Sequence, residues 1–226
     1  MSEPRMVEVR RKILKENDLV ARRLRDRFHR AGVQVISLVS SPGAGKTTLL
    51  ERVLTDLGRD HRIAALVGDL ATENDAARLA RFGAPVKQIT TGTVCHLDAT
   101  MVERAVETWT LEEFDFLFIE NVGNLVCPSS FDLGENLRIV LVSTPEGEDK
   151  PLKYPTIFNT ADAALVTKLD LTDVLGFDLD ALIQNIQLVR PGMPVLKVSV
   201  RTGQGITEFE QFLLKRRSTL ESAPTV

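Results

Sequence analysis

The stretch that most constrains the fold of this chain is residues 39–50, VSSPGAGKTTLL, which lies between an apolar run and a helical pattern. It matches the phosphate-binding pattern G-x-x-x-x-G-K-[ST] except at the first glycine, where the chain has Ser40. That glycine chiefly permits a tight chain reversal, so a serine is tolerated there if its backbone φ is negative. The residues expected to wrap the phosphates are Gly43, Ala44, Gly45, Lys46, Thr47 and Thr48.

Two side chains of this loop have expected roles of their own. Lys46 is expected to neutralise the β and γ phosphate oxygens, and the Thr47 hydroxyl to hold Mg²⁺. The alternative is an incidental glycine-rich turn between a strand and a helix. The intact G-K-T-T sequence in a strand-loop-helix context favours a nucleotide site.

From Val33 onward, short apolar runs alternate with helical patterns, as in a parallel sheet covered by helices on both faces. The predicted strands are 33–39, 63–67, 86–89, 116–119, 139–142, 163–166 and 195–198. The predicted helices are 46–57, 75–82, 100–109, 180–188 and 207–214. The expected fold class is therefore α/β, a P-loop NTPase with a mostly parallel sheet and helices on both faces.

An N-terminal amphipathic helix is expected before this domain. Residues 5–31 contain neither Pro nor Gly, and Ile13, Val20, Leu24 and Phe28 share one side of a helix. Packing of that side against the domain is the simpler interpretation, and a dedicated partner-binding helix is the alternative. The expected division is an N-terminal helix packed on the domain at 1–32, a P-loop GTPase domain at 33–219 and a flexible tail at 220–226.

Composition excludes several classes of partner. The formal net charge of −3 and the pI near 5.7 argue against bulk electrostatic attraction to nucleic acid or to anionic lipid. No apolar run approaches the roughly 18 residues of a membrane span, and the N-terminus is charged throughout. We therefore expect a cytoplasmic protein with no nucleic acid or membrane partner, in which Cys95 and Cys127 are not a structural disulfide.

The tetrapeptide Thr167-Lys168-Leu169-Asp170 resembles the guanine-specifying N-K-x-D sequence, with Thr in place of Asn. The Asp170 carboxylate can accept hydrogen bonds from N1–H and from the 2-amino group of guanine, and the Lys168 stem can cover the base. This favours GTP and GDP over adenine nucleotides. A further segment, Ser199-Val200-Arg201, resembles the last base-contacting loop of GTPases.

Acidic residues follow two predicted strands. We expect Asp69 to hold Mg²⁺, and Glu120 either to contact the ligands of the ion or to position the attacking water. The Gly123 N–H is expected to sense the γ-phosphate. Asp75 is a further candidate for Mg²⁺, with a capping box starting at Thr72 as an equal alternative. The catalytic residues expected from these patterns are Lys46, Asp69 and Glu120.

Two loop-prone stretches carry thiols and an imidazole. Cys95 and His96 lie in TGTVCHLD, and Cys127 lies in NLVCP. Two thiolates and one imidazole suit Zn²⁺ or Ni²⁺, but three ligands are too few for a closed site. A homodimer that pairs these loops across a two-fold axis would supply enough ligands, and buried structural thiols are the alternative.

Taken together, the motifs SSPGAGKTTLLE, GDLATENDA, TGTVCHLDA, FIENVGNLVCPSSFDLGE and EGEDKPLKYP resemble the HypB family, the GTPases that assist nickel insertion into [NiFe] hydrogenase. The resemblance runs from ILKEND to SVRTGQGI, and CHLDA separates the chain from the urease accessory GTPase UreG, which typically carries a C-P-H triplet. It implies that Cys95, His96 and Cys127 bind nickel or zinc at a homodimer interface. It also implies two partners, the nickel chaperone HypA and the hydrogenase large subunit.

The chain departs from the family pattern in two places. It shows no Cys-rich or His-rich N-terminal segment, so no nickel store or tight N-terminal site is expected, and Thr167 weakens the guanine argument. Hydrolysis is expected to be slow, because no catalytic base or arginine finger can be assigned. A urease-accessory-type GTPase, a P-loop ATPase or kinase with structural thiols, and a metal store or scaffold stay open as alternatives.

Overall fold

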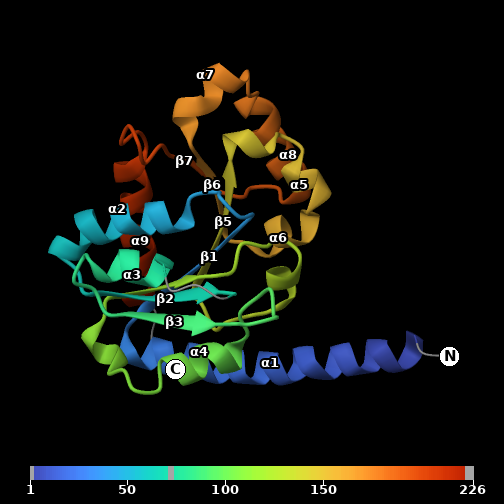
Figure 1. The fold of residues 1–226 in the computed structure, drawn as a ribbon, viewed down its shortest axis with the longest axis vertical. Coiled ribbons are helices and arrows are strands. Elements are labelled where there is room, and N and C mark those ends of the chain that lie inside the picture. The colour runs from blue at the N-terminus through green and yellow to red at the C-terminus, as the bar shows by residue number, and fades with distance from the viewer. Residues whose placement is uncertain (1–2, 71–73, 222–226) are drawn as a thin grey trace.

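The computed structural model describes residues 3–70 and 74–221. In this part of the chain, seven strands form one sheet in the order β3-β2-β4-β1-β5-β6-β7, with every pairing parallel (Figure 1). The strands are β1 Gln34–Ser40, β2 Ile63–Asp69, β3 Val86–Thr90, β4 Phe116–Glu120, β5 Leu137–Ser143, β6 Ala163–Thr167 and β7 Val195–Lys197. All seven predicted strands and the α/β class are confirmed. The parallel arrangement brings the carboxyl ends of the strands to one edge of the sheet, where ligands bind in such folds.

The helices are α1 Glu3–Ala31, α2 Lys46–Asp56, α3 Asn74–Ala80, α4 Ala99–Ala105, α5 Lys150–Lys153, α6 Pro155–Thr160, α7 Thr172–Leu175, α8 Leu179–Val189 and α9 Ile206–Glu221. Short 3₁₀ turns are η1 Leu57–Arg59, η2 Leu111–Glu113, η3 Cys127–Ser130, η4 Thr144–Glu146 and η5 Leu169–Leu171. The sequence patterns missed α5, α6 and α7, because helices of four to six residues are too short to show a helical period.

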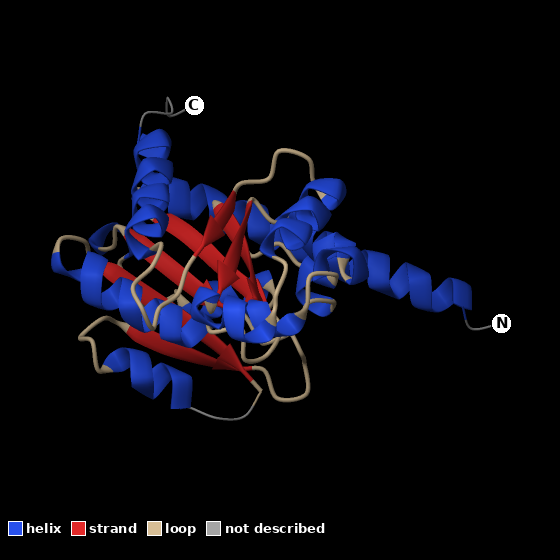
Figure 2. Cartoon of the chain, turned by 90° about the horizontal axis from the view of Figure 1, so that it is seen from above, coloured by secondary structure: helices blue, strands red, loops and turns tan. Residues whose placement is uncertain are grey.

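Alternate residues of the strands face two apolar layers. Ile36 and Leu38 pack with α2, α3 and α9 on one side of the sheet, whereas Val35 packs with α1 and α4 on the other. Val140 and Val142 continue this second side under α6 and α8. Helices therefore cover both faces, which explains why the strand sequences are continuously apolar (Figures 1 and 2).

The amphipathic helix α1 covers the sheet over only part of its length. Leu24 and Phe28 are fully buried, but Ile13 is 50% exposed. The expectation that Ile13 packs with them is wrong, because the N-terminal half of α1 runs beyond the edge of the domain (Figure 2). Among the described residues, no helix has the length and apolar character to cross a membrane.

Candidate nucleotide and metal site

The loop between β1 and α2 has the backbone that the phosphate-binding motif predicts. Gly43 and Gly45 have φ values of 75° and 97°, which only glycine adopts without strain. Ser40 does not share this conformation, since Lys168 is the single described non-glycine residue with a positive φ. The Ser40 hydroxyl instead accepts a hydrogen bond of 2.9 Å from Lys46 Nζ. A serine therefore fits the first position of the motif and gives the lysine a partner.

The side chains of Lys46, Thr47 and Glu120 meet in a buried cluster. Thr47 Oγ1 donates to Glu120 Oε1 at 2.8 Å, whereas Glu120 Oε2 is buried with no hydrogen-bond partner in the described part of the chain. Burial raises the pKa of Glu120 to about 7, and Lys46 opposes this effect. Burial also lowers the pKa of Lys46, opposed by the same carboxyl. Two oxygens at the end of β4 and the start of α2 are thus held where a cation would satisfy them.

A cavity of about 580 Å³ opens above this cluster. Its wall includes Asp69 and Asp75, so the structure brings all the predicted acidic candidates into one pocket. Arg78 also lines it and binds Glu51 through two hydrogen bonds of 2.9 and 3.0 Å. Thr72, the start of the alternative capping box for Asp75, lies outside the described residues.

Gly123 presses against the phosphate-binding loop. A Cβ atom at Gly123 would lie 2.9 Å from Pro42 Cα, which is closer than any real contact allows. Both residues line the cavity. Only glycine therefore lets the backbone after β4 approach the loop this closely.

The predicted base-binding residues also contact the phosphate-binding loop. Thr167 Oγ1 donates to the Ala44 carbonyl at 2.7 Å, and Lys168 Nζ donates to the Gly43 carbonyl at 2.7 Å. Thr167 thereby anchors the loop although it replaces the Asn of the motif. Lys168 has a left-handed backbone, with φ 59°, at the point where its side chain contacts the loop.

Asp170 and the loop after β7 are joined in the same region. Ser199 Oγ, which is fully buried, donates to Asp170 Oδ1 at 2.6 Å. The backbone around Ser199 is fixed by a hydrogen bond of 2.9 Å from its N–H to the Gln204 carbonyl. Val200 is half-buried and Arg201 is exposed. The structure thus brings Asp170 and Ser199 together, whereas the exposed Arg201 makes no hydrogen bond or ion pair with either of them.

The thiols and the imidazole converge on the neighbouring loops. The ligand atoms of Cys95, His96 and Cys127 all lie within 4.8 Å of one another, and the two sulfurs are 3.0 Å apart. Both cysteines are free thiols, and His96 Nδ1 is buried without a partner in the described part of the chain. The hydrogen bond with Cys127 raises the pKa of Cys95, and burial lowers the pKa of His96. A neutral imidazole with an unpartnered nitrogen beside two thiols fits a Zn²⁺ or Ni²⁺ ion.

Contacts of the described residues link this cluster to the nucleotide cavity. Asn121, which follows Glu120, accepts hydrogen bonds from Leu97 N at 3.1 Å and from Val122 N at 2.9 Å. The Leu97 side chain also lies over Gly68, where a Cβ atom would come within 2.8 Å of it. Asn124 Nδ2 donates to the Cys95 carbonyl at 3.2 Å. The loop that carries two of the three metal-ligand candidates therefore rests directly on the ends of β2 and β4.

Sequence reasoning missed two of the residues that hold these loops. Asn121 carried a signal, since it directly follows the acidic end of a predicted strand. Asn17 did not, because nothing in a charged helix distinguishes it. In the structure Asn17 is buried, accepts from Ala99 N at 2.8 Å and donates to the Asp132 carbonyl at 2.9 Å. It joins α1 to the segments that follow both metal-ligand loops.

Residues 34–197 match the family model described as CobW/HypB/UreG, nucleotide-binding domain. The chain is 46% identical over 217 residues to the hydrogenase maturation factor HypB of Azotobacter chroococcum mcd 1, an alignment that covers 96% of this chain and 71% of that protein. The chain belongs to the HypB family. It is also 43% identical over 215 residues to the hydrogenase/urease maturation factor HypB of Helicobacter pylori, covering 93% of this chain and 88% of that protein.

A solved structure of the HypB family agrees with the fold. The crystal structure of HypB from Helicobacter pylori in complex with nickel superposes with a TM-score of 0.86 at 42% identity, covering 93% of this chain and all of that one. The predicted family and the P-loop NTPase-like fold are therefore confirmed, and the chain has a nucleotide-binding domain.

Proposed function

We propose that this protein is a GTP-binding, slowly GTP-hydrolysing regulator that delivers nickel during [NiFe] hydrogenase maturation. One observation carries the proposal: Asn121 follows the acidic end of β4 and binds the backbone of Leu97, next to His96. A displacement at the phosphate end of β4 would therefore move the metal-ligand loop through this hydrogen bond. Membership of the HypB family supports the same conclusion.

Recognition of GTP is assigned to two groups of residues. The backbone from Gly43 to Thr48 surrounds the phosphates, with Lys46 pairing to their oxygens. Asp170, held by Ser199, accepts from the guanine base, which adenine cannot satisfy. A bound Mg²⁺ would neutralise charge on the β and γ phosphates. The residues suited to hold it are Thr47, Glu120, Asp69 and Asp75, of which Glu120 has a buried oxygen with no hydrogen-bond partner among the described residues.

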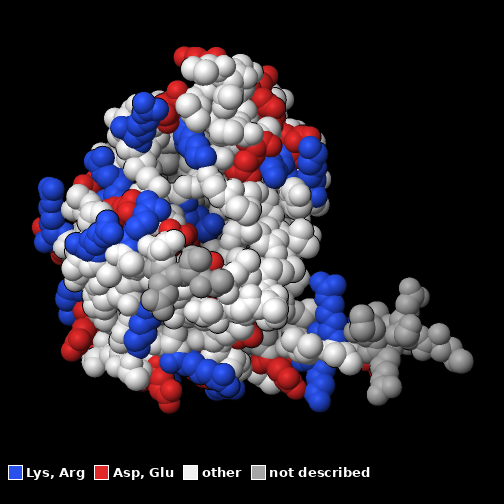
Figure 3. All heavy atoms as spheres, viewed as in Figure 1, with Lys and Arg blue, Asp and Glu red and all other residues white. Residues whose placement is uncertain are grey.

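Nickel, or zinc in its place, is the cargo assigned to Cys95, His96 and Cys127. Three ligands leave a coordination position open, so an ion can be exchanged rather than locked in. Val126, next to Cys127, is 60% exposed, and the surface between α6 and α1 is largely uncharged (Figure 3). Both features support a homodimer in which two such loops face each other across a two-fold axis. Nickel binding in the Helicobacter pylori relative supports this assignment.

In the proposed cycle, the chain's own residues pass the nucleotide state to the metal. With GTP bound, the Gly123 N–H and Glu120 lie next to the γ-phosphate and order the loop after β4. The ordered loop favours the dimer that completes the metal site, and hydrolysis relaxes it so that the ion or a partner leaves. By family, the partners are the nickel chaperone HypA and the hydrogenase large subunit, in the cytoplasm.

Nickel delivery to urease is a second candidate. The Helicobacter relatives carry the name hydrogenase/urease maturation factor, so the family includes proteins named for both enzymes. Restoration of hydrogenase or of urease activity in a strain that lacks its own factor separates the two candidates.

Metal and nucleotide binding are tested separately. Cys95→Ser and Cys127→Ser are each expected to abolish stoichiometric Ni²⁺ and Zn²⁺ binding while GTP affinity stays within a few-fold. His96→Ala is expected to weaken metal binding, and its matched control is His29→Ala, at an exposed histidine outside the cluster. Unchanged metal content in the cysteine variants would return both thiols to a structural role. ATP displacing GTP at comparable concentration would indicate an ATPase or kinase, and the absence of turnover would indicate a scaffold.

A further inference from the structure

The orientation of the His96 ring is set by a neighbouring aromatic ring. The ring centroids of His96 and Phe131 lie 3.9 Å apart with an interplanar angle of 31°. Metal-binding histidines usually fix their ring plane by a hydrogen bond from the second nitrogen to a carboxylate or carbonyl. Within the described residues neither ring nitrogen of His96 makes such a hydrogen bond, whichever of the two faces the ion. Stacking on Phe131 is therefore the contact that holds the plane of the imidazole.

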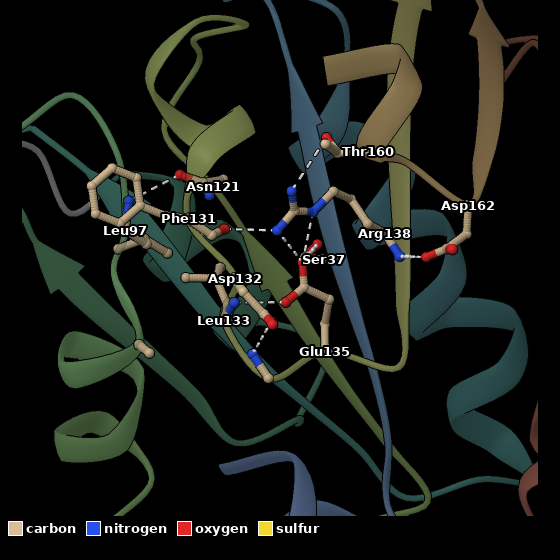
Figure 4. Close-up of polar contacts among 12 residues, drawn as sticks. Ser37, Leu97, Asn121, Phe131, Asp132, Leu133, Glu135, Arg138, Thr160 and Asp162 are labelled. Atoms are coloured by element: carbon tan, nitrogen blue, oxygen red, sulfur yellow. Dashed lines mark hydrogen bonds and ion pairs between the residues drawn. The ribbon is translucent and has the colours of Figure 1, made fainter. Parts of the chain in front are cut away.

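Phe131 is itself fixed through its backbone on both sides. Its N–H donates to the Pro128 carbonyl at 3.2 Å, which ties it to the η3 turn that starts at Cys127. Its carbonyl accepts from Arg138 Nη2 at 2.7 Å (Figure 4). One residue thus contacts the His96 ring, the turn of Cys127 and a buried guanidinium.

Arg138 belongs to a buried polar network on the central strands. Its Nε donates to Glu135 Oε1 at 2.7 Å, and Ser37 Oγ donates to the same oxygen at 2.9 Å. Leu133 N donates to the other carboxylate oxygen at 2.7 Å. Ser37 of β1 is the register partner of Arg138 of β5, so the network is rooted in the strand that leads to the phosphate-binding loop (Figure 4).

Stability alone does not explain the buried pair of Arg138 and Glu135, since replacing such a pair by apolar residues often leaves the free energy of unfolding unchanged. Its geometry points to a different role. Arg138 reaches Glu135 Oε1 with both Nε and Nη2, each at 2.7 Å, and Nη2 also donates to the Phe131 carbonyl. A planar guanidinium can make these contacts together, whereas the single ammonium group of a lysine cannot.

We infer that Phe131, together with Arg138 and Glu135, is a positioning residue for the metal site: it presents the His96 imidazole to the ion held by Cys95 and Cys127. This inference rests on the proposed metal-binding function. It adds a requirement for metal binding beyond the three ligands, namely a flat ring that stacks on His96 and is anchored to β1 and β5.

The test measures Ni²⁺ affinity by competition with a chromophoric chelator, and follows the thiolate-to-nickel charge-transfer absorption. Phe131→Leu keeps the apolar volume but removes the flat ring, and is expected to weaken binding about tenfold. The charge-transfer band persists, because both sulfurs still bind, but its position shifts. Phe131→Tyr keeps the ring and is expected to retain the wild-type Ni²⁺ affinity and the wild-type position of the charge-transfer band.

A double-mutant cycle with His96→Ala identifies the residue through which Phe131 acts. If Phe131 positions His96, then Phe131→Leu has no further effect in the His96→Ala background. An equal loss in both backgrounds, or wild-type affinity and spectrum in Phe131→Leu, would overturn the inference. Arg138→Lys, which keeps the charge but loses the bond to the Phe131 carbonyl, must give the same His96-dependent loss if Phe131→Leu does not fold. Failure of the wild type to bind Ni²⁺ would instead refute the proposed function.

Discussion

The hydroxyl of Thr47 donates a 2.8 Å hydrogen bond to Glu120, and this contact joins the phosphate-binding loop to the end of β4. It holds a carboxyl group in a buried position beside a lysine. Asn121 and Gly123 lie one and three residues after Glu120, so the same short segment contacts the metal-ligand loop and Pro42.

Glu120→Gln is expected to change how stability depends on pH in the nucleotide-free protein. The folded protein holds the Glu120 proton more tightly than the unfolded chain, with a pKa of about 7 against 4.5. Stability is therefore lost as the pH rises through this window, by about 3 kcal/mol in total. The glutamine keeps the acceptor for Thr47 and removes the titration.

Thermal unfolding in Mg²⁺-free buffer measures this effect. Glu120→Gln is expected to melt on the order of 5–10 °C above the wild type at pH 8, with the gap closing toward pH 5. Glu112→Gln, at an exposed position, should follow the wild type at every pH. Parallel wild-type and Glu120→Gln curves would contradict the prediction.

Asp170→Asn should change the base preference. The variant replaces an acceptor of the guanine N1–H and 2-amino hydrogens by an amide, so GDP affinity is expected to fall by about 100-fold or more. Xanthosine diphosphate, whose 2-oxo group accepts from the new amide, should gain affinity. Calorimetric titration with both nucleotides measures this exchange, and the exposed Asp173→Asn serves as control. Equal losses for both nucleotides would show that Asp170 does not contact the base.

Asn121→Ala should uncouple the two sites. It removes the acceptor for Leu97 N while leaving the ligands of both sites in place. In the wild type, the ratio of Ni²⁺ affinities in the presence of a GTP analogue and of GDP is expected to be at least about fivefold. The ratio should approach one in Asn121→Ala and stay at the wild-type value in Asn159→Ala, an exposed asparagine. A retained ratio would remove Asn121 from the connection.

Gly123→Ala should weaken nucleotide binding through a backbone displacement. The new methyl group would lie 2.9 Å from Pro42 Cα, so the segment after β4 must move away from the phosphate-binding loop. The expected cost in the free energy of unfolding is about 1–3 kcal/mol. Gly58→Ala, where an added Cβ meets nothing within 4 Å, is the matched control. Urea unfolding and GTP titration of the two variants provide the comparison.

The sheet was predictable because its strands are apolar on both faces, and the phosphate-binding loop because its glycines need special backbone angles. The part of α1 that packs on the domain could not be predicted, since helical periodicity continues through Ile13 even though this residue does not pack on the domain. The stretches around Cys95 and Cys127, which lie 32 residues apart, could be assigned to one metal site because both carry thiol ligands.

The supports of the site could not be predicted in the same way. Asn17, Phe131 and Arg138 act through contacts between segments remote in sequence, and their residue types are ordinary in a helix, a loop and a strand. The role of Thr167 was also hidden, because its hydroxyl replaces an amide by reaching a backbone carbonyl rather than a ligand. Such roles follow from three-dimensional packing and leave little periodic pattern.

The hydrogen bonds from Thr167 and Lys168 to the carbonyls of Ala44 and Gly43 have a consequence for how a nucleotide enters. They give two carbonyl oxygens of the loop a hydrogen-bond donor in the nucleotide-free protein. One wall of the pocket is thus ordered during folding, so its ordering does not reduce the free energy of nucleotide binding. Rearrangement on binding falls to the opposite wall, around Glu120 and Gly123, which also carries the route to the sulfur ligands.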